Sequence, residues 1–129
     1  MKTLKQHINE SLKIGKNLSD WTSYSCQPKT KKELKEIIKE RISEQGNKCD
    51  LNDIDTSLID DMSFLFCESS FNGDISEWDT SSVEDMSYMF TDSKFNKDIS
   101  NWKINKDCNT CDMFTKCPIK EEYKPKLPR

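Results

Sequence analysis

The sequence DTSLIDDMSFLFCESSFNGDISEW, residues 55–78, is followed directly by a variant of itself, DTSSVEDMSYMFTDSKFNKDISNW, residues 79–102. The two stretches place similar residues at the same offsets, with a period of 24 residues. A fixed period of about 20 to 50 residues is typical of repeat architectures, in which each unit buries its apolar face against its neighbour. Partial matches extend the pattern over 50–119, where 103–119 is a degenerate third unit.

Apolar residues that recur with this period are expected to line the interior. The expected interior pairs are Leu58/Val83, Met62/Met86, Leu65/Met89, Phe66/Phe90, Phe71/Phe95, Ile75/Ile99 and Trp78/Trp102. Between them, Asp, Ser and Asn side chains favour turns because they bond to nearby backbone. The short run 82–86 predicts one strand in each coil.

These columns resemble a known family. Asp-Thr-Ser-x-Val-x-Asp-Met-Ser-x-Met-Phe, followed by Phe-Asn-x-Asp-Ile-Ser-x-Trp, is similar to the BspA-type leucine-rich-repeat surface proteins over 55–102. Such proteins are common in gut bacteria and mycoplasmas and occur in mobile elements. The resemblance implies protein or surface recognition and brings no catalytic residues. With the period, it predicts an α+β fold: a short right-handed leucine-rich-repeat-like solenoid with an N-terminal amphipathic helical cap.

The sequence pattern of residues 30–45 predicts a helix that caps the solenoid. Thr30 and Glu33 form a capping-box pair, and Gly46 is a good stop signal. The alternative is that its apolar stripe docks into another protein; the stripe comprises Leu34, Ile37, Ile38, Arg41 and Ile42. The predicted organisation is an N-terminal helix and loop at 1–29, the helical cap at 30–49, the BspA-like repeats at 50–119 and a basic flexible tail at 120–129.

The first eleven residues also resemble the capsid-targeting leader of internal proteins in some tailed phages. In such leaders an amphipathic start ends in an Ile-x-Glu site, which here is Ile8-Asn9-Glu10, with cleavage before Ser11. The resemblance implies a phage-encoded internal or virion-associated protein. The alternative is an ordinary N-terminal helix.

Charge is unevenly distributed along the chain. Residues 50–101 hold 13 acidic and 2 basic residues, whereas 1–49 hold 6 acidic and 11 basic ones. An acidic repeat surface suits a partner protein with a basic surface and disfavours nucleic acid. The candidate binding residues are Asp60, Asp61, Glu84 and Asp85, joined by Trp78 and Trp102 if these are exposed. The alternative is that the acids only keep the repeats soluble.

Catalysis and cofactors have little support in the sequence. The chain has one histidine and three glycines, so it carries no Gly-rich phosphate loop. Cys108, Cys111 and Cys117 have the only suggestive metal-ligand spacing, but structural zinc needs a fourth ligand. Free thiols, zinc and disulfides remain the alternatives for the six cysteines, and we expect no cofactor.

No apolar run resembles a secretory signal or a membrane span, which predicts an intracellular or virion-interior location. The sequence thus predicts a non-enzymatic protein–protein interaction module that presents an acidic repeat surface. A packaged phage protein is the alternative, and an enzyme or metal protein is a third hypothesis.

Overall fold

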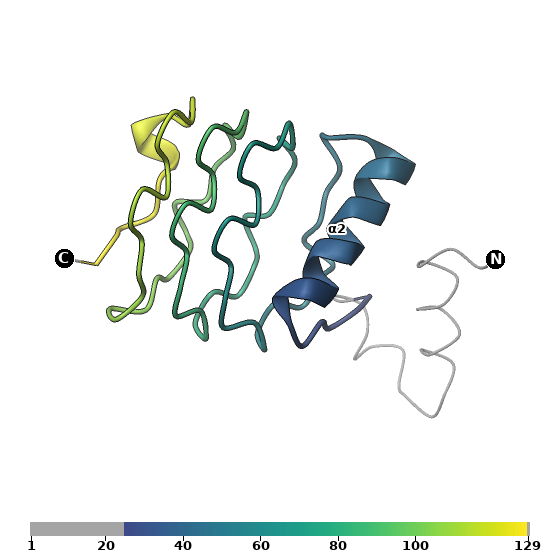
Figure 1. The fold of residues 1–129 in the computed structure, drawn as a ribbon, viewed down its shortest axis with the longest axis horizontal. Coiled ribbons are helices and arrows are strands. Elements are labelled where there is room, and N and C mark those ends of the chain that lie inside the picture. The colour runs from purple at the N-terminus through teal and green to yellow at the C-terminus, as the bar shows by residue number, and fades with distance from the viewer. Residues whose placement is uncertain (1–24, 129) are drawn as a thin grey trace.

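The computed structural model describes residues 25–128, which form a row of stacked chain turns with a helix at one end (Figure 1). The described residues contain one α-helix, α2 (Lys31–Gln45), one 3-10 helix, η2 (Glu121–Tyr123), and no strand. α2 lies at one end of the row and η2 at the other (Figure 1). The predicted N-terminal helix and the leader with its Glu10–Ser11 site lie outside the described residues.

The helix predicted over 30–45 is confirmed as α2. Thr30 is its N-cap, and the Thr30 hydroxyl accepts a hydrogen bond from the Glu33 N–H. The Glu33 carboxylate in turn accepts from the Lys29 N–H at 3.2 Å, one residue before the expected position. Gly46 ends the helix with a φ of 88°, a conformation that glycine adopts without steric cost. The buried face of α2 consists of Leu34, Ile37, Ile38 and Arg41.

The predicted α+β class is wrong, and the right-handed leucine-rich-repeat-like solenoid with it, because the described residues form no strand or sheet. Among the described residues, the strand-type pairings between neighbouring turns are isolated parallel bridges such as Asp61↔Asp85 and Asp85↔Asn109, and further single backbone hydrogen bonds join the turns elsewhere. Turns interrupt every run, and Phe64 has a φ of 59°, which lies outside the range of a strand. Strand-type pairing therefore does not extend beyond single residues, and 82–86 is not a strand.

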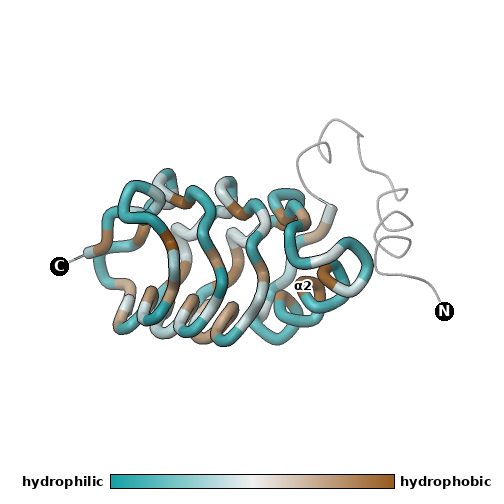
Figure 2. The backbone as a smooth tube through the Cα atoms, turned by 90° about the horizontal axis from the view of Figure 1, so that it is seen from above, coloured by the Kyte–Doolittle hydropathy of each residue, from teal (hydrophilic) through white to brown (hydrophobic). Residues whose placement is uncertain are grey.

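Residues 24 positions apart nevertheless contact each other in the core. Phe66 stacks on Phe90 with ring centroids 5.5 Å apart, and Phe90 stacks on Phe114 at 5.6 Å. Figure 2 shows apolar residues recurring along the successive turns. Because each unit is too small to bury these rings alone, every turn depends on the next for its interior.

One predicted interior pair, Leu58/Val83, is wrong at its first member. Leu58 is 47% exposed, whereas Ile59 is 0% exposed. Ile59, not Leu58, precedes the buried Val83 by 24 residues. A side chain one position out of register points to the other side of an extended backbone, so Leu58 faces solvent.

A charged cluster ties α2 to the adjoining turn. The buried Arg41 guanidinium donates through Nη1 to Asp53 Oδ1 at 2.9 Å, and a second donor, Nη2, contacts Asp53 Oδ2. Arg41 Nη2 also donates to the Ser25 hydroxyl at 3.1 Å, and that hydroxyl bonds to Asp53. These contacts join the start of the described chain, the helix and the turn at 51–54.

Candidate protein-interaction surface

The four predicted acidic binding residues lie together on neighbouring turns. Asp61 and Asp85 form a parallel bridge, and the Glu84 N–H donates to the Asp60 carbonyl at 2.7 Å. Asp61 and Asp85 begin the first and second of three equivalent stretches, which we call ladder segments: 61–68, 85–92 and 109–116. The outer surface of the first two segments, with Asp60 and Glu84 at its margin, is the ladder face.

Half of this acidic set shapes the turns. Asp61 Oδ1 accepts from the N–H and hydroxyl of Ser63 at 2.9 and 2.7 Å, and Asp85 has the same contacts with Ser87 at 2.9 and 2.6 Å. Burial, the largest single influence, acts to raise the pKa of Asp61, but hydrogen bonds from Ser63 and the charge of Lys31 hold this pKa below its usual range. Asp61 and Asp85 therefore have a structural role in their turns.

The other two acidic residues, Asp60 and Glu84, have carboxylates that are available to a binding partner. Asp60 and Glu84 are exposed, and among residues 25–128 their carboxylates form no hydrogen bond or ion pair. They lie one residue before the bridged pair on adjacent turns, so each of the two turns has an exposed acidic residue at the margin of the ladder face.

A stacked aromatic pair, in which Phe64 is exposed and Tyr88 is half-buried, lies in the middle of the ladder face. Phe64 is 50% exposed, and its ring stacks on that of Tyr88 with centroids 4.8 Å apart and an interplanar angle of 8°. The nearby carboxylate of Asp112 raises the pKa of Tyr88. Sequence reasoning missed this pair, although its position was visible: each aromatic lies directly before a buried residue, Leu65 or Met89, in the repeat.

Trp78 and Trp102 belong to the core. They are 3% and 4% exposed, and their rings stack with centroids 6.3 Å apart. Each indole N–H donates at 2.9 Å to a backbone carbonyl of the preceding turn, that of Leu51 or Ile75. These hydrogen bonds satisfy the one polar group of each buried indole, so neither tryptophan contributes to the ladder face.

The three cysteines with metal-ligand spacing point to different partners. Cys108 is buried, the exposed Cys111 thiol donates to Asp112 at 3.6 Å, and the Cys117 thiol donates to the Phe95 carbonyl at 3.2 Å. Within the described part of the chain, no three His, Cys, Asp or Glu side chains are grouped so as to hold a metal ion. All six cysteines there are free thiols in the structure.

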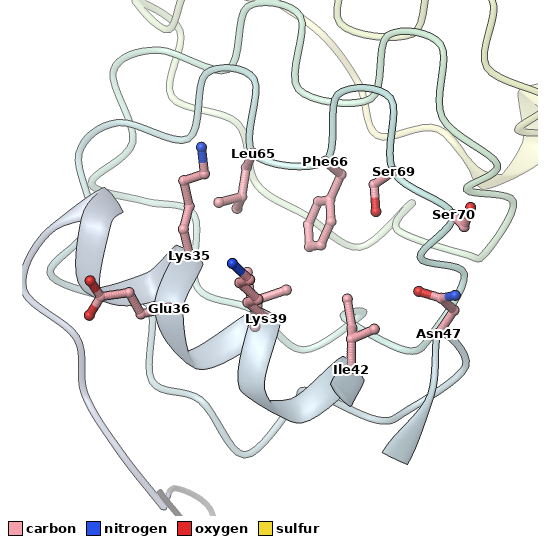
Figure 3. Close-up of a pocket in the computed structure, with 10 residues that line it drawn as sticks. Lys35, Glu36, Lys39, Ile42, Asn47, Leu65, Phe66, Ser69 and Ser70 are labelled. Atoms are coloured by element: carbon pink, nitrogen blue, oxygen red, sulfur yellow. The ribbon is translucent and has the colours of Figure 1, made fainter. Parts of the chain in front are cut away.

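A groove of about 490 Å³ separates α2 from the first ladder segment (Figure 3). Phe66 and Ile42 point toward each other across it, with Lys35 and Lys39 on the helix side and Ser69 and Ser70 near one end (Figure 3). Since Phe66 is only 1% exposed, the groove gives little access to the core. It is an open recess rather than an enclosed ligand site.

Comparison with known proteins identifies a family. The model of a family described as "Mycoplasma protein of unknown function, DUF285" matches residues 32–121, a range that contains all three ladder segments. This match agrees with the BspA-like resemblance at the level of a repeat-family domain. No curated protein and no solved structure matches the chain significantly. Over the described residues, no helix has the length and apolar character needed to cross a bilayer.

Proposed function

The chain belongs to the DUF285 family, and from this premise we propose that it is a non-enzymatic protein-binding module whose ladder face takes up a basic segment of a partner protein. The observation that carries the proposal is the stacked pair of exposed Phe64 and half-buried Tyr88, on the same two turns that carry the exposed carboxylates of Asp60 and Glu84.

The backbone conformation at Phe64 and Tyr88 indicates that the aromatic side chains have a role beyond forming the turn. Phe64 and Tyr88 have φ values of 59° and 57°, and Asp112 at the equivalent place in the third ladder segment has 51°. Such a conformation costs a non-glycine residue about 1–2 kcal/mol, and it is more common for Asp and Asn than for bulky residues. An aromatic ring at this position is an unfavourable choice for the turn, which supports a role for the ring itself.

The chemistry of the face specifies the partner. Exposed aromatic rings bind the cationic groups of Arg and Lys for about 0.5–1 kcal/mol per contact. The neighbouring Asp60 and Glu84 carboxylates add charge attraction that weakens with salt. We therefore expect the partner segment to combine Arg or Lys with apolar side chains that pack on the rings.

Selection of a random peptide library on the immobilised chain tests this proposal. Peptides rich in Arg and Lys are expected to be enriched. Their affinity is expected to fall about tenfold or more, or about 1.4 kcal/mol, in the double variant Phe64→Ala/Glu84→Lys, as measured by fluorescence anisotropy at low and moderate salt.

The control is Glu77→Lys, which makes the same charge change at an exposed position outside the ladder segments. It is expected to leave the affinity of the selected peptides within about twofold of the unmodified chain, since distant surface changes seldom couple. Peptides that bind all variants equally, or that carry no excess of basic residues, would contradict the proposal.

A further inference from the structure

Hydrogen bonds between the ladder segments run in one direction, except at the start of the third segment, where the Asn109 N–H donates back to the Glu84 carbonyl at 3.0 Å. Four N–H groups of the first segment donate to carbonyls of the second over 2.8–3.0 Å, and four of the second donate to the third over 2.7–3.0 Å. The donors are Met62, Phe64, Phe66 and Glu68 in the first segment, and Met86, Tyr88, Phe90 and Asp92 in the second. Along this side of the row, each segment thus donates toward the C-terminal end.

The third segment repeats these donors, and among residues 25–128 no further ladder segment pairs with it. The N–H groups of Thr110, Asp112, Phe114 and Lys116 lie 24 positions after the donors of the second segment, and no other described residue accepts a hydrogen bond from them. The carbonyls of Thr110, Asp112 and Phe114 accept hydrogen bonds from residues three positions later in the same turn, from the N–H groups of Met113, Thr115 and Cys117. The outer edge, which we call the donor edge, therefore presents donors without alternating acceptors.

The side chains at the donor edge also differ from those of the preceding segments. Phe114 is half-buried: its ring stacks on Phe90, and the Lys124 ammonium lies 5.3 Å from its centroid. The acidic positions of the second turn are replaced, since Cys108, Asn109 and Lys116 stand where the preceding turn has Glu84, Asp85 and Asp92. An acidic segment placed against this edge would therefore not face acidic side chains at these three positions.

We propose that the donor edge binds a ladder segment of this same repeat type, carried by another polypeptide, through its row of carbonyls. The segment would add four N–H···O=C bonds in the register already used twice within the chain, and an aromatic side chain equivalent to Phe90 would take the place of the Lys124 ammonium against the Phe114 ring. Unpaired rows of backbone groups are known templates for a further chain.

The directionality excludes other occupants. An ordinary extended strand presents N–H and C=O groups alternately along its edge, so its own N–H groups would face donors. The donor edge of a second copy would oppose donors to donors. The carbonyl edge of a second copy is covered by α2, and the Lys31 ammonium already donates to the Ser63 carbonyl there at 3.2 Å.

A tethered segment provides the test. A second copy of residues 79–102 is joined to the end of the full chain by a flexible Gly-Ser linker, which supplies an effective concentration of about 1 mM. The matched control carries the same 24 residues in scrambled order. Amide hydrogen exchange, read by NMR, is expected to slow about tenfold or more at Thr110, Asp112, Phe114 and Lys116 in the first fusion only.

Two substitutions in the first fusion separate the edge from the rest of the surface. Phe114→Ala is expected to reduce the protection of these four amides, whereas Phe64→Ala, on the ladder face, is expected to leave it unchanged. Equal exchange in the two fusions would overturn the proposal, as would protection of these amides in the unfused chain through self-association, measured by sedimentation. None of these results depends on the peptide binding proposed for the ladder face.

Discussion

Phe90→Ala is expected to lower the free energy of unfolding by about 3–5 kcal/mol, the usual cost of removing a fully buried phenylalanine. The Phe90 ring is 0% exposed and stacks on Phe66, Phe95 and Phe114, so it joins three successive turns. Urea unfolding followed by circular dichroism measures the change.

Phe64→Ala is the matched control for Phe90→Ala. It removes the same side chain from a site that is 50% exposed, where among residues 25–128 the ring stacks only on that of Tyr88. The expected loss is below about 1.5 kcal/mol, the upper value for an aromatic pair beyond its buried area. Equal losses for the two variants would show that the column of phenylalanines does not support the fold.

Asp53→Ala is expected to destabilise the protein by about 2–3 kcal/mol at neutral pH. The change leaves the Arg41 guanidinium, in a residue that is 7% exposed, with the Ser25 hydroxyl as its remaining contact in this cluster. Removing one partner of a fully buried ion pair costs about 3–5 kcal/mol. We expect less here because the Asp53 side chain is 36% exposed and water can reach the site.

The same cluster makes the stability of the fold depend on pH. Burial, the largest single influence, acts to raise the pKa of Asp53, but hydrogen bonds from Arg41 and Ser25 and the Arg41 charge hold this pKa below its usual value. A lowered carboxyl pKa stabilises the fold above the unfolded-state value of about 4, and this contribution is lost as pH falls through the folded-state pKa. The free energy of unfolding, measured at pH 7 and in steps below pH 4, should therefore fall less with decreasing pH in Asp53→Ala than in the unmodified chain.

The control for the acid profile is Asp107→Ala, an exposed position whose carboxylate contacts no other described residue. Its free energy of unfolding at pH 7 is expected to stay within about 0.5 kcal/mol of that of the unmodified chain. Its loss of stability below pH 4 is expected to be as large as in the unmodified chain. An unchanged acid profile in Asp53→Ala would instead assign the pH dependence to other carboxylates.

The 24-residue period predicts which side chains contact each other. Residues at equivalent positions in successive units lie next to each other in the structure, whatever the local backbone conformation. The period correctly pairs Phe66 with Phe90 and Trp78 with Trp102. It does not reveal how the backbone runs between these points. Strands fail because Asp61 and Asp85 bond to the serine two residues later, and these turns end each extended run.

The candidate surface was predictable only in part. The sequence places Asp60, Asp61, Glu84 and Asp85 in matching positions, but composition cannot separate the exposed acids from those that hold a turn. The Phe64–Tyr88 pair was missed because large apolar residues are usually assigned to the interior, and the left-handed backbone that turns these rings outward has no direct sequence signal. The direction of the backbone hydrogen bonds, on which the donor edge depends, requires coordinates.

The central claim is that side chains 24 positions apart share one continuous interior, with Phe66, Phe90 and Phe114 in a single column. The most direct test is a nuclear Overhauser experiment on chain with labelled phenylalanine rings. We predict cross-peaks from Phe90 to both Phe66 and Phe114, and no direct cross-peak between Phe66 and Phe114. Absence of both Phe90 cross-peaks in the folded protein would contradict the account.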